Sequence, residues 1–380
     1  MKAVTFQGLR KIEVKDVPDP IIQNPDDIIV KITSTAIGGS DLHAVHGMTP
    51  YVKRDDILGC EAMGIVEAVG KSVTRVQRGD RVVIPCHVAC GECRTCRRLQ
   101  RPCVSTSDAG LSDELDEHDA PRAMIGHGVA GQAEYVRVPY GNFAPYVLPQ
   151  SCELPDEHLL FLSDILPTAF WGVEEAGVKR GDTVVVLGCG PLGLLVHKLV
   201  WLKRPKRVLA VDYIEYRLAH AHIHNNVETI NFTNGENTGE LLRELTLGGA
   251  DVVIDCVGMD GKKTLMERTE TNLKIQSGTL SAIHTAARAT RRGGTIQLLG
   301  TYGTRYNAFP LGDMYTRNIT LKMGLAPVVH YMPRLFSLLE SQAIDPTDVI
   351  THRVPLSDAK HAYEVFDAKM DNCIKVILKP

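Results

Sequence analysis

The stretch VVVLGCGPLGLLVHKLVWL at residues 184–202 decides the fold of the second half of the chain. An apolar run typical of a buried strand leads into a glycine-rich turn, and a mostly apolar segment of helical periodicity follows. The turn has the spacing GxGxxG between strand and helix, the arrangement that binds the pyrophosphate of a dinucleotide. This stretch therefore predicts a nucleotide-binding α/β domain.

Each position of the turn has a physical role. We expect Gly188 to permit the tight turn, Gly190 to let the pyrophosphate approach the backbone, and Gly193 to let the helix pack closely. Pro191 suits the first helical turn, where its missing N–H costs nothing, and Leu192 follows it. Since the helix N-terminus faces the anion, these five residues form the predicted cofactor-binding turn.

An acidic residue follows at the expected distance. Asp212 ends the next strand, RVLAVD, where its side chain can accept hydrogen bonds from ribose hydroxyls. A carboxylate there repels a 2′-phosphate, so NAD is favoured over NADP. The alternative is a glycine-rich turn with an incidental Asp. Arg217 is expected either beside the adenosine or as a solvated surface residue.

Strands alternate with helical segments around this turn, which is typical of a parallel doubly wound sheet. The six strands of a full dinucleotide-binding fold are expected at 184–187, 207–212, 228–231, 251–256, 295–299 and 320–323. We therefore predict an NAD-binding Rossmann domain over residues 161–326.

The rest of the chain has a different pattern. Residues 1–160 contain short β-rich runs separated by turns, such as IIVKI at 28–32 and RVVIP at 81–85. They predict a mainly β, barrel-like catalytic domain. Residues 327–380 end in the strand-like CIKVILKP and are expected to return to that first domain, which would then be discontinuous in sequence.

Four of the ten cysteines lie close together, at residues 90–103. Cys90, Cys93, Cys96 and Cys103 supply four thiolates on a compact loop, the ligand type and number of a closed tetrahedral zinc site. The clustering favours a metal over disulfides. We predict a structural zinc whose role is to hold a loop that has little core of its own.

Composition excludes several function classes. The chain has 380 residues, 44% of them hydrophobic and 23% charged, with a formal net charge of −3, so nucleic acid is not an expected partner. No segment has the roughly 18 continuous apolar residues of a membrane span, so no membrane interaction is expected. The N-terminus alternates apolar and polar residues like a strand and lacks the apolar core of a signal peptide. We therefore expect a cytoplasmic protein.

These elements in this order, together with the segments GGSDLHAVHG, LGCEAMGIVEAVG, GQAEYVRVP and LFLSDILPTAFWG, resemble the zinc-containing alcohol dehydrogenases among the medium-chain dehydrogenases. The resemblance covers essentially the whole chain, and the branch similar to glutathione-independent formaldehyde dehydrogenase matches best. It implies a GroES-like catalytic domain, a homodimer or homotetramer, and hydride transfer between NAD and a small-molecule alcohol, aldehyde or ketone.

The resemblance also locates an altered catalytic zinc centre. The family holds this zinc with a cysteine, a histidine and, in this branch, an aspartate, and here Gly38, Cys60 and Asp164 stand at those positions. Glu61, which the family also has, is a possible third ligand beside Cys60 and Asp164. The alternative is that Cys60 is a small buried side chain and Gly38 a turn residue, with no metal bound.

Three further residues match family positions. Ser40 and His43 match the relay that moves the hydroxyl proton to solvent, and Thr168 matches a position beside the nicotinamide. Without the resemblance, the first two would be ordinary polar loop residues. Thr168 would be a helix-start residue after Pro167.

Function is predicted as NAD-dependent oxidoreduction of an alcohol and an aldehyde or ketone, with an altered or absent catalytic zinc. One alternative is a metal-free reductase that acts on an activated carbonyl. Another is a non-catalytic or regulatory NAD-binding protein. A long polar insertion, residues 260–278, raises the further option that it covers the adenosine and holds NAD permanently.

Overall fold

The chain forms two compact units in the computed structural model, of which residues 1–48, 52–87, 89–98, 103, 130–234, 237–260, 279–303 and 306–380 are described. Unit 1 comprises Met1–Pro167 together with Leu325–Pro380, and unit 2 comprises Thr168–Gly324. Most of the long polar insertion, residues 261–278, lies outside the described residues, as do residues 99–102 of the zinc lobe. No helix in the described ranges is long and apolar enough to cross a membrane.

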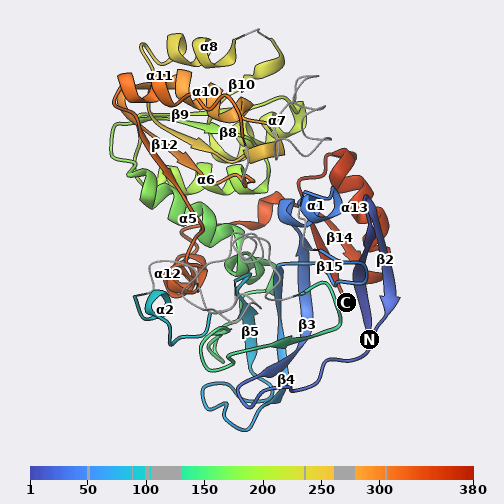
Figure 1. Ribbon diagram of the computed structural model, residues 1–380. Coiled ribbons are helices and arrows are strands. Elements are labelled where there is room, and N and C mark those ends of the chain that lie inside the picture. Colours follow the sequence, from blue (N-terminus) through green and yellow to red (C-terminus); the bar gives the residue numbers. More distant parts are fainter. Residues whose placement is uncertain are drawn as a thin grey trace. The chain divides into compact units, whose positions relative to one another are not determined.

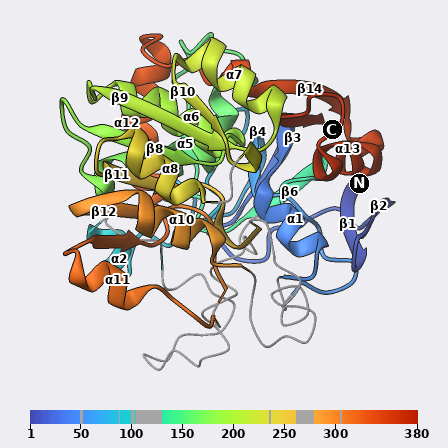
Figure 2. The same ribbon diagram turned by 90° about the horizontal axis from the view of Figure 1, so that it is seen from above.

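Unit 2 is built on a six-stranded sheet in the order β10-β9-β8-β11-β12-β13, in which all pairs are parallel. The order from β10 to β12 can be followed in Figure 2. The strands are β8 (Thr183–Leu187), β9 (Arg207–Asp212), β10 (Glu228–Asn231), β11 (Ala250–Asp255), β12 (Thr290–Leu298) and β13 (Thr320–Met323). Because the chain leaves β8 in both directions across the sheet, the carboxyl end of β8 is the switch point where dinucleotides bind. The predicted Rossmann fold is confirmed.

Helices cover both faces of this sheet (Figure 1). They are α6 (Pro191–Trp201), α7 (Glu215–Asn225), α8 (Thr238–Leu245), α10 (Ser281–Ala289) and α11 (Leu311–Thr316). Helices α6 and α7 pack together over β8 and β9, whereas α8 and α10 pack together over β8, β11 and β12. Val185 and Leu187 face the α8/α10 side and join a core with Leu242 and Ile283. Burial of both faces explains why β8 is continuously apolar instead of alternating.

The first residues of β12 were not expected. Thr290 pairs with Ala250, and the register shifts before Thr295 pairs with Val252, so the strand carries an irregularity. Gly293 and Gly294 lie in this segment, and glycine is depleted in regular strands. The sequence therefore predicted only the later, apolar part of the strand.

Unit 1 contains a seven-stranded sheet in the order β14-β15-β3-β4-β5-β7, with β6 also paired to β3, and a separate β1-β2 pair. The strands are β1 (Lys2–Gly8), β2 (Lys11–Asp16), β3 (Ile28–Ile37), β4 (Glu61–Val69), β5 (Arg81–Ile84), β6 (Tyr135–Val138), β7 (Tyr146–Val147), β14 (Ile350–Pro355) and β15 (Lys375–Lys379). Strand β15 pairs antiparallel with β3, so the C-terminal segment completes a sheet begun near the N-terminus.

Helices and a 3₁₀ turn connect these strands (Figure 1). They are α1 (Gly39–Val45), α2 (Arg94–Arg98), α4 (Asp156–Leu159), the 3₁₀ turn η1 (Leu160–Ser163), α12 (Val328–Glu340) and α13 (Ala359–Ala368), and α5 (Ile165–Ala176) continues from unit 1 into unit 2. Turn η1 packs on β4 and β5, and Phe161 and Leu162 are fully buried. Residues 161–167, which we expected in the cofactor domain, therefore group with unit 1, and Asp164 with them.

Candidate active site

The glycine-rich turn in unit 2 has the geometry that its sequence requires. Gly188 has a φ of +94°, a left-handed conformation that favours glycine. A Cβ at Gly193 would lie 1.9 Å from the carbonyl oxygen of Gly188, so the helix approaches the turn too closely for any side chain. At Gly190, by contrast, the nearest atom to such a Cβ is an Arg217 nitrogen at 3.7 Å. The backbone at Gly190 is thus open to a ligand.

The Asp212 side chain fixes this turn. Its carboxylate accepts hydrogen bonds from the backbone N–H groups of Cys189 at 2.7 Å, Tyr213 at 2.7 Å and Ile214 at 3.1 Å. Asp212 is buried at the end of β9. A carboxylate has about four acceptor positions, so these bonds leave capacity for a ligand hydroxyl.

The other predicted cofactor residues lie in unit 2 as well. Pro191 is the first residue of α6 and Leu192 is half-buried beside it. Arg217 is buried on α7, and its Nε has no hydrogen-bond partner among the described residues. Thr168 is the fourth residue of α5 and is half-buried.

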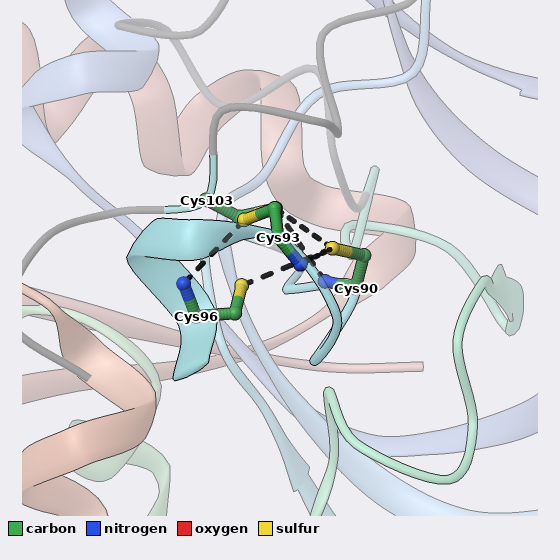
Figure 3. Close-up of side chains that lie close together, drawn as sticks. All are labelled: Cys90, Cys93, Cys96 and Cys103. Carbon is green, nitrogen blue, oxygen red and sulfur yellow. Dashed lines mark hydrogen bonds between the residues drawn. The ribbon is translucent and has the colours of Figure 1, made fainter. Parts of the chain in front are cut away.

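The four clustered cysteines converge in unit 1 (Figure 3). Their sulfur atoms all lie within 4.8 Å of one another. The Sγ–Sγ distances are 3.5 Å for Cys90–Cys103, 3.8 Å for Cys93–Cys103 and 4.0 Å for Cys90–Cys96. A tetrahedral zinc with Zn–S bonds of about 2.3 Å requires sulfurs about 3.8 Å apart. The cluster therefore fits a zinc ion in size and in ligand type.

Backbone N–H groups point at these sulfurs. Cys93 N donates to Cys90 Sγ and Cys96 N to Cys93 Sγ, both at 3.4 Å, which suits thiolates. Gly91 has a φ of +80°, and a Cβ there would lie 2.7 Å from the ring of Phe143. The loop is thus shaped by its cysteines and by one glycine.

A second polar cluster in unit 1 surrounds Cys60, which directly precedes β4. The Cys60 Sγ lies 3.1 Å from Ser40 Oγ and 3.6 Å from Asp164 Oδ2. Ser40 and His43 lie on α1, and His43 is buried. The structure thus brings together Cys60, Asp164 and Ser40, which are far apart in sequence.

Glu61 is engaged elsewhere. Its carboxylate forms an ion pair with the Lys375 ammonium, and the exposed fractions of these side chains are 0% and 1%. Lys375 Nζ also donates to the carbonyl oxygen of Ile37 at 3.1 Å. Burial raises the pKa of Glu61, and the Lys375 ammonium opposes that shift. Sequence reasoning missed Lys375, because no local signal places β15 against this site.

Gly38 faces the same centre. A Cβ at Gly38 would lie 3.2 Å from Glu61 Oε1 and 3.4 Å from Ser40 Oγ. The adjacent Asp41 carboxylate accepts from the N–H groups of Gly38 at 2.8 Å and Gly59 at 3.1 Å. Burial raises the pKa of Asp41 to about 6. At Gly38 the centre is therefore bordered by backbone, with no donor side chain.

Sequence reasoning also missed Cys86. This buried residue follows β5, and its Sγ lies 3.3 Å from Asp164 Oδ1 and 3.0 Å from Nδ1 of the neighbouring His87. Its backbone N–H donates to the carbonyl oxygen of Ser163 at 2.8 Å, which ties the residue to the segment carrying Asp164. The antiparallel register of β4 and β5 is the signal that could have found it.

The electrostatics of the centre are dominated by burial and negative charge. Burial raises the pKa of the Cys60 thiol well above its ordinary value, and the carboxylates of Asp164, Asp41 and Glu61 raise it further. A thiolate at Cys60 therefore needs a cation beside it. Cys60, Asp164 and Glu61 do not have all their ligand atoms within 4.8 Å of one another, unlike the four cysteines. The donor types suit zinc, but Glu61 does not converge with the other two.

Comparison with known proteins fits this architecture. Residues 24–150 match the family model described as the alcohol dehydrogenase GroES-like domain. An uncharacterized zinc-type alcohol dehydrogenase-like protein, AdhB of Bacillus subtilis, is 54% identical over 100% of both chains. The chain belongs to the zinc-type alcohol dehydrogenase family.

Two further relatives span nearly the whole chain. The glutathione-independent formaldehyde dehydrogenase of Pseudomonas aeruginosa is 30% identical over 97% of this chain and 95% of its own. The solved alcohol dehydrogenase from Thermus sp. ATN1 has a TM-score of 0.82 and 32% identity, covering 100% of this chain and 99% of its own. The resemblance seen in the sequence is confirmed, and the protein is an alcohol dehydrogenase-like oxidoreductase with a GroES-like domain.

Proposed function

We propose that the protein oxidises an alcohol to an aldehyde or ketone, reversibly, by transferring hydride to NAD. The observation that carries this proposal is the turn at Gly188–Gly193, with an open backbone at Gly190 and a buried Asp212. The turn suits a pyrophosphate, and the Asp212 carboxylate suits a ribose hydroxyl of NAD while repelling the 2′-phosphate of NADP.

The residues of unit 1 would handle the substrate oxygen. Ser40 Oγ accepts the hydroxyl proton as hydride leaves carbon, and His43 takes the proton on toward solvent. Cys60 and Asp164 would hold a metal beside Ser40, since both side chains touch at this centre. A zinc ion bound there supplies Lewis-acid polarisation of the substrate oxygen. A second zinc, at the four cysteines, would be structural.

A metal-free reductase acting on an activated carbonyl is the second candidate. It is favoured by the absence of a donor side chain at Gly38 and by the ion pair that occupies Glu61. Ser40 and His43 would then act as hydrogen-bond donor and acid without help, which restricts the substrate to a carbonyl beside an electron-withdrawing group.

Steady-state turnover over a panel of alcohols and aldehydes tests the proposal. We expect NAD-linked turnover that Ser40→Ala lowers by about 10²- to 10⁴-fold in kcat, as expected when a proton-transfer group is removed. Turnover that survives strong chelation would favour the metal-free candidate. Tight NAD binding without turnover on any substrate would indicate a regulatory NAD-binding protein instead.

A further inference from the structure

We propose that Cys86 is a ligand of the altered metal centre, so that Cys60, Cys86 and Asp164 bind one zinc ion. This site differs from the set of Cys60, Glu61 and Asp164 considered above, and it compensates for the thiolate that Gly38 does not provide. The inference rests on the proposed function, because a metal at this position would polarise the substrate oxygen.

The strand register brings the two cysteines to the same end of the β4-β5 pair. Strands β4 and β5 pair antiparallel, with Ala62 opposite Ile84 and Met63 opposite Val83. Cys60 lies two residues before Ala62 and Cys86 two residues after Ile84, so both cysteines follow the same end of this ladder.

Asp164 lies between the two thiols. One carboxylate oxygen lies 3.6 Å from Cys60 Sγ and the other 3.3 Å from Cys86 Sγ. In a tetrahedral site with Zn–S of about 2.3 Å and Zn–O of about 2.0 Å, a sulfur and an oxygen ligand lie about 3.5 Å apart. Each contact by itself matches the sulfur–oxygen spacing of a zinc site, although the two thiols contact different oxygens of Asp164.

The backbone holds this arrangement. The hydrogen bond from Cys86 N to Ser163 O fixes Cys86 beside the residue that precedes Asp164. Cys60 and Cys86 are buried, with exposed fractions of 7% and 2%. The three ligand atoms do not all lie within 4.8 Å of one another, so binding requires the two cysteine side chains to turn toward a common point.

Charge balance favours a cation over a simple pair of buried thiols. The carboxylates of Asp164, Asp41 and Glu61 all act on Cys60, and the Lys375 ammonium is already paired with Glu61. Buried charges are stable only when they are paired or coordinate a metal. A divalent ion held by Cys60, Cys86 and Asp164 would pair with the carboxylate and the two thiolates inside the protein.

The test is metal binding by the full-length protein, with zinc as the probe. Wild type, saturated with Zn²⁺ and desalted, should retain about two ions per chain, one of them at the four cysteines. Cys86→Ser should lower the affinity for the second ion by at least about 100-fold. Loss of a residue that only supports a metal ligand already lowers metal affinity by up to about 100-fold, and loss of a ligand should cost at least as much. Cys86→His, which supplies another donor, should retain it. The matched control is Cys152→Ser, which changes a half-buried cysteine outside the centre and should keep both ions.

A second measurement uses only wild type, so it tests the inference even if the variants fail to fold. Protein holding one zinc per chain is titrated with Co²⁺, and thiolate-to-cobalt charge-transfer absorption should appear as the second site fills. The inference would be overturned if wild type bound no second ion or showed no such band. It would also be overturned if the Cys86→Ser protein folded and bound the second ion as tightly as wild type. If the protein turns over alcohol with NAD but binds no second ion, the proposed function holds and the metal site is wrong. If it binds a second ion but shows no turnover, the metal site holds and the proposed function is wrong.

Discussion

Breaking the ion pair between Glu61 and Lys375 should strongly destabilise the protein. Lys375→Met removes the ammonium and leaves the Glu61 carboxylate buried without its counter-charge. Removing one partner of such a pair costs about 3–5 kcal/mol of the free energy of unfolding. The double change Glu61→Gln with Lys375→Met removes both charges, so its cost should be smaller than that of Lys375→Met alone.

The destabilisation should depend on pH. The Lys375 ammonium lowers the pKa of Glu61, while burial raises it, so the variant lacks the lowering effect. A carboxyl whose pKa in the folded state lies above its unfolded value of about 4.3 loses stability as pH rises from the unfolded pKa to the folded pKa, and the variant, with the higher folded pKa, keeps losing stability to higher pH. The free energy of unfolding of Lys375→Met should therefore fall further below that of wild type at pH 8 than at pH 5.

Urea unfolding of wild type, both single variants and the double variant forms a double-mutant cycle that measures the coupling. The control is Arg78→Met, which breaks the exposed Arg78–Glu67 pair and should change stability little. Additive single-variant effects of less than about 1 kcal/mol each, with no pH dependence, would refute the reasoning, because removing one partner should leave an uncompensated buried charge.

Three further predictions concern the metal and cofactor sites. Cys93→Ser should lower the thermal midpoint and remove about one zinc per chain, as measured by calorimetry and metal analysis; unchanged zinc would reject the structural site. NAD should bind more tightly than NADP in cofactor titrations, and Asp212→Ala should narrow the difference; equal binding by wild type would show that Asp212 does not face the ribose. Gly38→Cys combined with Cys60→His should raise the affinity for the second zinc ion and the activity on simple alcohols, since a Cβ at Gly38 faces the centre; an unchanged affinity would mean that the family positions are misassigned.

The Rossmann fold could be predicted because its evidence is local. The run before Gly188 and the helix after it carry their own periodicity, and Asp212 ends a strand whose apolar pattern is clear. Residues 290–294 were not predicted as strand, because two glycines interrupt the strand pattern at the irregular start of β12. Local pattern therefore predicts regular strands better than irregular ones.

The altered centre depends on long-range pairing, which local pattern does not encode. Cys60 and Asp164 were linked only through family resemblance, and their contact spans 104 residues. Lys375 reaches Glu61 across 314 residues because β15 pairs with β3. Cys86 had no motif of its own, and it reaches the centre because β4 and β5 pair and because its side chain contacts Asp164.

Hydride transfer to NAD is tested most directly with an alcohol deuterated at the carbinol carbon. The protein is incubated with NAD and each labelled alcohol of the panel, and the reduced cofactor is analysed by mass spectrometry. The account predicts that NADH forms and carries deuterium from the substrate, because hydride moves directly from the carbinol carbon to the cofactor. Failure to form NADH with any alcohol, or NADH without deuterium, would contradict it.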